Sequence, residues 1–301
     1  MFSYDRLSRK PLLFKSFTGL TVAEFDSLCK GIEGRYKKYE IKRLSAKRRE
    51  RKIGAGRPFK LCLQNRLLML LIYYRMYITY TLTGFLFDID QSNVCRDIQK
   101  IEPLVRQYLP IPQKLYRIAK RLKTQEEVEH YFPGFKAFID VTEQQIPRPR
   151  DKRRKRLYYS GKRKRHTVKQ ELMVNQQGKI LYKTRCKTGR NHDYRIYKTN
   201  RPKTPKDVEN AFDLGFLGVE KDFPEQISSL PFKSKRSKPL PVEEKEYNRI
   251  HARARVVVEH VICRIKKFRI MSDVFRNRLK RYNRISDIVT GLVNYRVMAT
   301  V

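Results

Sequence analysis

The chain has 301 residues, 40% of them hydrophobic, which is enough for one large domain or two ordinary ones around a substantial core. Its 69 Lys and Arg against 30 Asp and Glu leave a formal charge of +39 that is spread along the chain. Such a charge repels itself unless a polyanion neutralises it, so a nucleic acid bound through its phosphates is the expected partner. A ribosomal or other structural RNA-binding protein has the same charge balance.

Cysteine usage and hydropathy exclude other classes of protein. The five cysteines are isolated and form no CxxC pair, so they predict neither a disulfide framework nor a zinc site and indicate a reducing compartment. Charged residues between Asp5 and Lys10 argue against a signal peptide. The most apolar run, Leu67 to Tyr74, is far shorter than the roughly 20 residues that a bilayer requires. We therefore expect no membrane partner.

Residues 1–60 predict a short helix followed by a basic arm. Thr21 and Glu24 have the spacing of a capping box, which predicts a helix of about ten residues. The segment from Lys37 to Arg57 is extremely basic and predicts a flexible arm that binds phosphate. A solvated linker without a defined contact has the same composition.

Residues 61–132 predict a helix-turn-helix-like DNA-binding region and a linking helix, Lys114 to Tyr131. Helical periodicity covers three segments joined by tight polar turns, residues 61–74, 79–87 and 91–109. In a helix-turn-helix the last of these would enter the major groove, where Ser92, Asn93 and Arg96 would face the bases. A helical bundle that only packs against the rest of the protein has the same spacing.

Residues 133–301 predict an α/β domain with a mixed sheet. Strands are expected over residues 135–141, 166–175 and 180–187, with a turn at 176–179, and a later short strand ends at Asp213. Helices are expected after Asp193, from about Val242 to Phe268, and over residues 285–298. The first three strands form a meander, and the helices would cover the sheet.

Three acidic residues occupy positions that this topology can bring to one edge of the sheet. Asp140 closes the first strand, Asp213 closes a later strand, and Glu259 lies on the long helix. Two carboxylates about 4 Å apart repel by roughly 4 kcal/mol at a dielectric of about 20, so such a cluster requires a cation. Hard oxygen ligands suit Mg²⁺ or Mn²⁺, and two such ions can activate a water or a 3′-hydroxyl and stabilise the leaving oxygen of a phosphodiester.

The long helix carries the most specific pattern. At about 100° per residue, Arg255, Glu259 and Lys266 share one stripe, beside an apolar stripe that includes Ile250 and Val258. Glu259 is therefore expected at the margin of the core, with two cations nearby that could hold phosphate. An ordinary ion pair between Arg255 and Glu259, four residues apart, is the alternative.

Asp193 competes with Asp213 for the place of the second acid, because it also follows a strand. Asp213 is preferred since it ends an apolar run before a turn that contains glycine, whereas Asp193 would cap the next helix. His192 could support the site through a hydrogen bond or be purely structural. Four cations are expected either to bind DNA phosphate or to be solvated, Lys162, Arg163, Lys164 and Arg165.

Five ordered segments carry a family resemblance: FIDVTEQQIPRP at 138–149, YSGKRKRH at 159–166, TGRNHD at 188–193, FDLGFLG at 212–218, and RVVVE at 255–259 with Lys266. Together they resemble the DDE transposases of bacterial insertion sequences, in the branch related to eukaryotic Harbinger elements. Leu214 and Phe216 depart mildly from the Lys-Gly-Tyr that usually follows the second Asp. Related groups have a Tyr where this chain has Ala252, so a role assigned to that Tyr does not transfer.

The resemblance implies an RNase H-like catalytic core over residues 133–301. It implies Mg²⁺-dependent cleavage at terminal inverted repeats and transfer of the freed 3′-hydroxyl into target DNA. Double-stranded DNA is then the partner of a homo-oligomer that acts on paired ends in the bacterial cytoplasm, at the nucleoid. The catalytic and metal-binding triad would be Asp140, Asp213 and Glu259. An inactive copy that acts as a DNA-binding repressor is the alternative from another class.

Overall fold

A computed structural model of the chain describes residues 2–46, 48, 50, 52–53, 55, 58–234 and 239–299. The chain divides into two compact units, the first made of residues 1–109, 267–270 and 284–289 and the second of residues 110–266, 271–283 and 290–301. Part of the basic arm expected up to Arg57 lies outside the described residues. No helix of the described ranges is long and apolar enough to cross a membrane.

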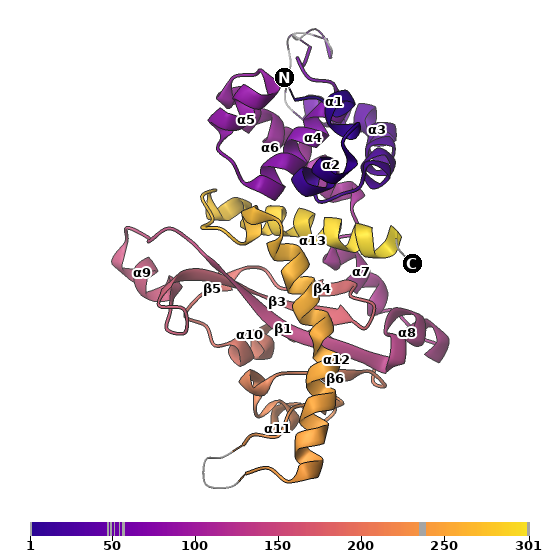
Figure 1. Cartoon of the computed structure of the whole chain (residues 1–301), viewed down its shortest axis with the longest axis vertical. Coiled ribbons are helices and arrows are strands. Elements are labelled where there is room, and N and C mark those ends of the chain that lie inside the picture. Colours follow the sequence, from indigo (N-terminus) through magenta and orange to yellow (C-terminus); the bar gives the residue numbers. More distant parts are fainter. Residues whose placement is uncertain are drawn as a thin grey trace. The chain divides into compact units, whose positions relative to one another are not determined.

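The first unit is helical (Figure 1). Its helices are α1 (Tyr4–Ser8), α2 (Pro11–Thr18), α3 (Val22–Ser45), α4 (Leu63–Met76), α5 (Tyr80–Phe87) and α6 (Gln91–Tyr108). The last three confirm the helices that were expected over residues 61–74, 79–87 and 91–109. The capping box of Thr21 and Glu24 is also present at the start of α3. That helix was expected to have about ten residues and instead continues to Ser45, so the beginning of the basic arm is helical.

Long-range contacts explain why α3 extends beyond its apolar half. The helix is anchored by Phe25, Leu28 and other buried side chains in its first three turns. Further along, Arg35 lies over the ring of Tyr108, and the hydroxyl of Tyr39 donates to the Lys100 carbonyl on α6. Helices in proteins are stabilised mainly by such packing rather than by local propensity, which is why the sequence alone placed the end too early.

A buried ion pair joins two helices of the first unit. Arg66 of α4 donates to both carboxylate oxygens of Asp97 on α6 at 2.9 Å, and both side chains are almost fully buried. Its guanidinium also lies 3.8 Å from the centre of the Phe59 ring and donates to the hydroxyl of Tyr36. Removing one partner of such a pair leaves an uncompensated charge in the core, so the pair fixes how α6 sits against α4.

The turn between α5 and α6 requires a glycine. Asp88 ends α5 in the left-handed region with φ 54°, and the amide of Ile89 donates to the Gly84 carbonyl at 3.0 Å. A Cβ on Gly84 would lie 2.4 Å from the carbonyl oxygen of Ile89. The chain can therefore turn this tightly into α6 only because residue 84 has no side chain.

The second unit contains a mixed sheet with strand order β2-β3-β1-β6-β7, in which β4 and β5 also pair with β3. The strands are β1 (Lys136–Gln145), β2 (Tyr159–Ser160), β3 (Arg165–Asn175), β4 (Ile180–Lys183), β5 (Lys187–Thr188), β6 (Glu209–Ala211) and β7 (Ser228–Ser229). β1, β3 and β4 form the expected antiparallel meander, with Gly178 in the turn at φ 80°. β6 is parallel to β1, and β7 is parallel to β6.

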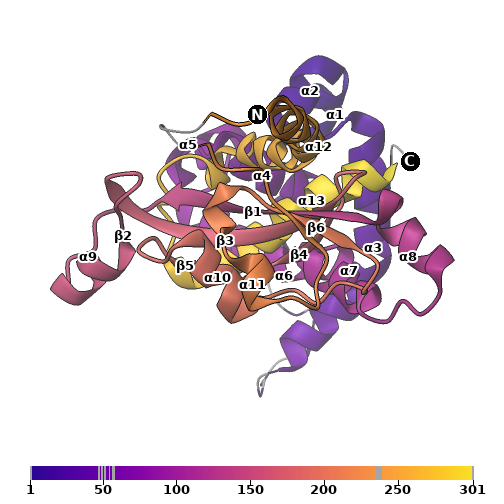
Figure 2. The same ribbon diagram turned by 90° about the horizontal axis from the view of Figure 1, so that it is seen from below.

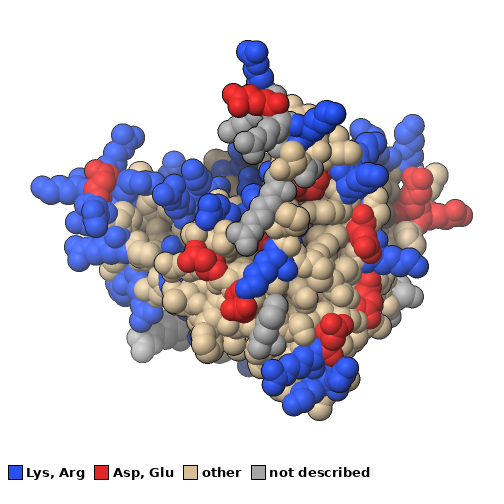
Figure 3. Space-filling model, turned by 90° about the horizontal axis from the view of Figure 1, so that it is seen from above, with Lys and Arg blue, Asp and Glu red and all other residues tan. Residues whose placement is uncertain are grey.

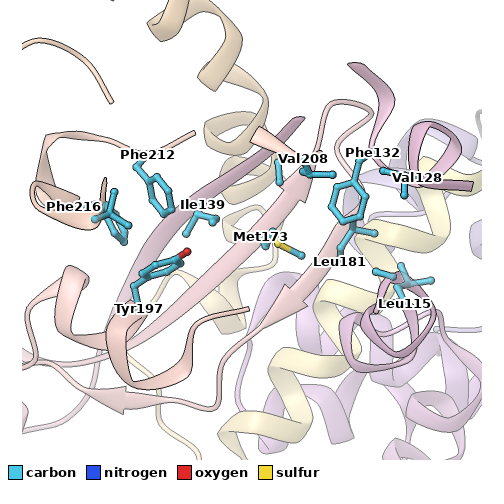
Figure 4. Close-up of a cluster of buried hydrophobic side chains, with 13 residues drawn as sticks. Leu115, Val128, Phe132, Ile139, Met173, Leu181, Tyr197, Val208, Phe212 and Phe216 are labelled. Carbon is cyan, nitrogen blue, oxygen red and sulfur yellow. The ribbon is translucent and has the colours of Figure 1, made fainter. Parts of the chain in front are cut away.

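Helices cover both faces of this sheet, and Figure 2 shows α10 (Asp193–Asn200) and α12 (Val242–Lys266) on opposite sides. On the α10 side, Ile139, Met173, Tyr197 and Phe212 belong to one buried apolar cluster (Figure 4). On the other side, α12 packs against β1 and β3 through its buried positions Val258, Val261 and Ile265. The final helix, expected over residues 285–298, is α13 (Tyr282–Ala299).

Four expectations about the second unit were wrong in detail. β1 continues to Gln145, so Asp140 lies in the middle of a strand that its pairing with β3 prolongs. The single linking helix is two, α7 (Pro112–Ala119) and α8 (Gln125–Tyr131), because Thr124 starts the second with its own capping box. The third strand is interrupted after Lys183. Ile250 is 57% exposed because His251 is the side chain that this turn of α12 buries.

We predict that Gly84→Ala destabilises the first unit by about 2 kcal/mol, because the new methyl group must displace a backbone carbonyl. Gly34 of α3 is the matched control, since a Cβ there would meet no atom within 4 Å. Gly34→Ala should stabilise the helix by roughly 0.5–1 kcal/mol. Urea unfolding followed by circular dichroism measures both effects, and equal behaviour of the two variants would contradict the tight turn.

A second prediction concerns Glu171 of β3, whose carboxyl oxygens are buried without a hydrogen-bond partner among the described residues. Burial raises its pKa from 4.5 to about 8, with a smaller contribution from Asp193. Unfolding then releases a proton between these values, so raising the pH through this window favours the unfolded chain by up to roughly 1.4 kcal/mol per unit. Glu171→Gln should remove this component. Parallel stability curves of the two proteins between pH 5 and pH 8 would refute it.

Candidate active site

The pairing of β1 with β6 sets the relation between two of the predicted acids. Phe138 is the register partner of Ala211 in this parallel pair. Continuing the register by two residues places Asp213 opposite Asp140, and the backbone at Asp213 is still extended, with φ −94° and ψ 176°. Side chains two residues apart on a strand share a face, so both carboxylates belong to the same side of the sheet.

The two carboxylates are held by short backbone hydrogen bonds. Asp140 Oδ1 accepts from the amide of Val141 at 2.7 Å, and Asp213 Oδ1 accepts from the amide of Gly215 at 2.9 Å. The second bond makes Asp213 the cap of a short 3₁₀ turn, η2 (Leu214–Phe216). Each acid is therefore oriented by its own loop or strand rather than by a distant partner.

The electrostatics of Asp140 differ from those of an ordinary surface carboxylate. Its pKa is raised from 3.8 to about 6, mainly by burial and to a smaller extent by the negative charges of Asp213 and Asp193. Arg255 and the amide of Val141 oppose this shift. A carboxyl group that is kept partly protonated by burial and by acidic neighbours becomes fully charged when a cation joins the group.

Three residues of α12 share the stripe predicted from the sequence, Arg255, Glu259 and Lys266. Two of them, Arg255 and Lys266, interact electrostatically with Asp140. Arg255 is buried, and its Nη2 lies 4.0 Å from Asp140 Oδ2. Burial lowers the pKa of Lys266, whereas the charges of Asp140 and Glu143 act to raise it. Glu259 lies between these cations on the stripe and is exposed.

The expected alternative, an ion pair between Arg255 and Glu259, is not formed within the described residues. Arg255 points to Asp140 instead, and its Nη1 is buried without a hydrogen-bond partner in the part of the chain that is described. A buried donor without a partner costs about 1–3 kcal/mol, so this nitrogen favours an added acceptor such as a phosphate oxygen.

Asp193, the rival second acid, has a partner of its own. Its Oδ1 accepts from Lys169 Nζ at 2.8 Å, and this lysine is buried and also donates to the Asn191 carbonyl. Asp193 lies in the first turn of α10, whose N-cap is His192, so the expected capping role of Asp193 was wrong by one position. The His192 side chain is exposed and makes no capping hydrogen bond.

The carboxylate oxygens near Asp140 are ligands of the type that divalent metal ions bind. The acids that act on Asp140 offer hard carboxylate oxygens, and their mutual repulsion is what a bound cation relieves. Across the described ranges, no three His, Cys, Asp or Glu side chains are close enough together to hold a metal ion. Asp140 and Asp213 are brought together by the sheet, whereas Glu259 shares only the stripe that passes Asp140.

The other predicted contacts lie on exposed surfaces. Ser92, Asn93 and Arg96 are exposed near the beginning of α6, and Arg96 donates to the Ser92 hydroxyl at 2.7 Å. Asp90 caps this helix by accepting from the Ser92 amide. The four cations expected to bind phosphate span the exposed turn between β2 and β3 and the first residue of β3, Lys162, Arg163, Lys164 and Arg165.

Sequence reasoning missed two groups of residues at the site. Lys169, which holds Asp193, was not singled out, although a lysine in the middle of a predicted strand is a recognisable signal. Arg148 and Arg190 lie far apart in the sequence and line the same surface groove. No local pattern links such residues, because the fold alone brings them together.

Two family matches and one relative agree with this architecture. Residues 139–294 match the family described as DDE superfamily endonuclease, and residues 59–111 match the helix-turn-helix of DDE superfamily endonuclease. A probable transposase for insertion sequence element IS702 from Microchaete diplosiphon is 32% identical over 280 residues, 92% of this chain and 95% of the relative. No solved structure matches the chain.

The fold, the helix-turn-helix and these matches agree on what the chain does. The chain has a helical DNA-binding region followed by a mixed-sheet α/β domain, and its superfamily uses divalent metal ions. The helix-turn-helix and the similarity to a transposase imply that the chain binds DNA and is a nuclease. The chain belongs to the DDE superfamily of endonucleases, as a transposase of insertion sequences.

Proposed function

We propose that this transposase hydrolyses a phosphodiester bond at each end of its element and transfers the freed 3′-hydroxyl into target DNA. The catalytic acids are Asp140, Asp213 and Glu259. The observation that carries the proposal is the register that aligns Asp213 with Asp140, on the face of the sheet against which Arg255 packs. An acidic pair beside a buried cation can bind a phosphate and its metal ions together.

The three acids would hold two divalent ions, Mg²⁺ or Mn²⁺, which activate the attacking oxygen and stabilise the leaving oxygen. Arg255 binds the phosphate next to Asp140 through its buried Nη1, which has no other hydrogen-bond partner in the described structure. Lys266 adds a second positive charge on the same stripe of α12. The hydrogen bonds to Val141 and Gly215 keep the two Asp side chains oriented.

The remaining regions position DNA for this chemistry. Within residues 61–132, helix α6 recognises the terminal inverted repeats through Ser92, Asn93 and Arg96. The basic turn at 162–165 binds phosphates near the cut. Each chain carries one set of acids, whereas an element has two ends, so we propose that a homo-oligomer acts on paired ends.

We predict that Asp213→Asn lowers Mg²⁺-dependent nicking of duplex DNA that carries the element's own ends by roughly 10²- to 10⁴-fold, because a metal ligand contributes several kcal/mol to the transition state. Asp140→Asn and Glu259→Gln should act alike. Nicking of a labelled duplex and joining of its product to a target duplex measure both steps. Gel-shift assays check that each variant still binds the ends.

Asp193→Asn is the matched control for this prediction. It weakens the ion pair with buried Lys169 and should lower thermal stability, while nicking per folded molecule changes little. If Asp193→Asn abolished nicking and Asp213→Asn did not, the second acid would be Asp193. Nicking that none of these substitutions affects would leave a DNA-binding protein without this active site.

A further prediction tests α6. Asn93→Ala or Arg96→Ala should weaken binding to the element's ends by about 1–3 kcal/mol, because each removes a side chain able to pair with a base. Binding to unrelated duplex DNA should change much less. Gln99 is also exposed on α6, two turns from the N-terminus, and Gln99→Ala serves as the control. An equal loss of affinity for both DNAs would show that these residues contact only the backbone.

A further inference from the structure

A basic groove of about 870 Å³ lies in the second unit, between α9 (Lys152–Tyr158), the β2–β3 hairpin and the loop before α10. Five of the residues that line it are cations, Arg148, Lys155, Arg156, Lys164 and Arg190. Figure 3 shows Lys and Arg gathered along the left edge of the molecule, the side on which Figure 1 shows α9. No Asp or Glu is among the described residues that line the groove.

These five cations have no acidic partner in the described part of the chain. This distinguishes them from Arg163 in the same turn, which lies 4.0 Å from Glu143. Positive charges that converge without carboxylates repel one another, and a multiply charged anion relieves that repulsion. The groove is therefore suited to a ligand that carries several negative charges.

The groove is built by close backbone packing. The amide of Arg190 donates to the carbonyl of Leu157 at 3.2 Å, which ties the loop before α10 to the end of α9. A Cβ on Gly189 would lie 2.7 Å from the Tyr158 carbonyl oxygen and 2.1 Å from the Thr167 hydroxyl. The two walls can come this close only because residue 189 is glycine, so the cations are held by a defined backbone.

An aromatic residue distinguishes this groove from a surface patch that binds only phosphate. Tyr159 lines it with 42% of its surface exposed, and its ring meets that of His166 edge-on, with the centroids 5.7 Å apart. The two residues are register partners on β2 and β3, which fixes the orientation of the tyrosine. An exposed ring among cations offers a stacking surface for a base, and the bases of an intact duplex are already stacked on each other.

We propose that this groove binds single-stranded DNA, with phosphates on the cations and an unpaired base stacked on Tyr159. The inference rests on the proposed function, because cleavage at an element end creates the strand end that can then unpair and leave the acidic site. β1 connects the two places: its part from Asp140 to Gln145 spans roughly 17 Å at the usual rise per residue, and the amide of the next residue, Ile146, donates to the carbonyl of His166 in the groove. A DNA strand that follows β1 away from the acidic site would therefore reach Tyr159, the register partner of His166.

The absence of tryptophan from the sequence makes a direct test possible. Tyr159→Trp places the only tryptophan of the full-length protein at the groove, and its emission can be excited apart from that of the tyrosines. Without added metal, an unlabelled single strand of about 12 nucleotides should quench the tryptophan emission. The DNA concentration at half-maximal quenching should be at least about tenfold lower than for a duplex of the same sequence. Adding Arg190→Gln should lower the slope of log Kd against log salt by about 0.7, the contribution of one phosphate contact.

Tyr247→Trp is the matched control, because Tyr247 is similarly exposed, at 38%, and lies near the acidic Glu209 and Glu220. Its emission should not respond to the single strand. Equal quenching of Tyr159→Trp by duplex, or none by either DNA, would overturn the proposal, and unchanged melting temperatures exclude misfolding. The quenching should persist when Asp140→Asn is added. A failure of the catalytic proposal would therefore leave this result intact, and the two can be separated.

Discussion

The parallel pairing of β1 and β6 is the constraint on which the candidate active site depends. Phe212 follows β6 and is buried in the apolar cluster with Ile139 and Tyr197. Because neighbouring side chains of an extended segment point to opposite faces, burial of Phe212 turns Asp213 toward the face of Asp140. A slip of one residue would bury the acid and expose the phenyl ring. The hydrophobic effect that closes the core therefore also selects which acid faces Asp140, and α12 brings Arg255 to the same place.

Much of this fold could be predicted because the decisive signals are local. The capping box of Thr21 and Glu24, the turn at Gly178 and the apolar periodicity of α12 are each contained in a few consecutive residues. Element lengths could not be predicted in the same way. β1 is extended by its pairing with β3, and α3 by contacts with α6, and both depend on residues far away in the sequence.

The candidate site shows the same division between local and distant causes. The stripe that carries Arg255, Glu259 and Lys266 follows from helical geometry and could be read from the sequence. The partner of Arg255 could not be read from the sequence. Arg255 lies four residues before Glu259, yet it turns to Asp140, which lies on a different element. Likewise, Asp193 resembles an acid of the site in the sequence, and only the fold shows that buried Lys169 holds it.

Side chains occupy backbone groups at two borders of the sheet. At β4 the amide of Asn294 on α13 binds both the N–H and the carbonyl of Ile180, as a neighbouring strand would. At the opposite border β7 has only two residues, and His251 Nε2 lies 3.3 Å from the Ser229 carbonyl. The bonded backbone groups of Ile180 and Ser229 are thus not free to pair with a strand from another molecule. Strand addition from a second copy of the chain, a common first step of aggregation, is therefore blocked at Ile180 and at Ser229 by side chains that belong to the fold itself.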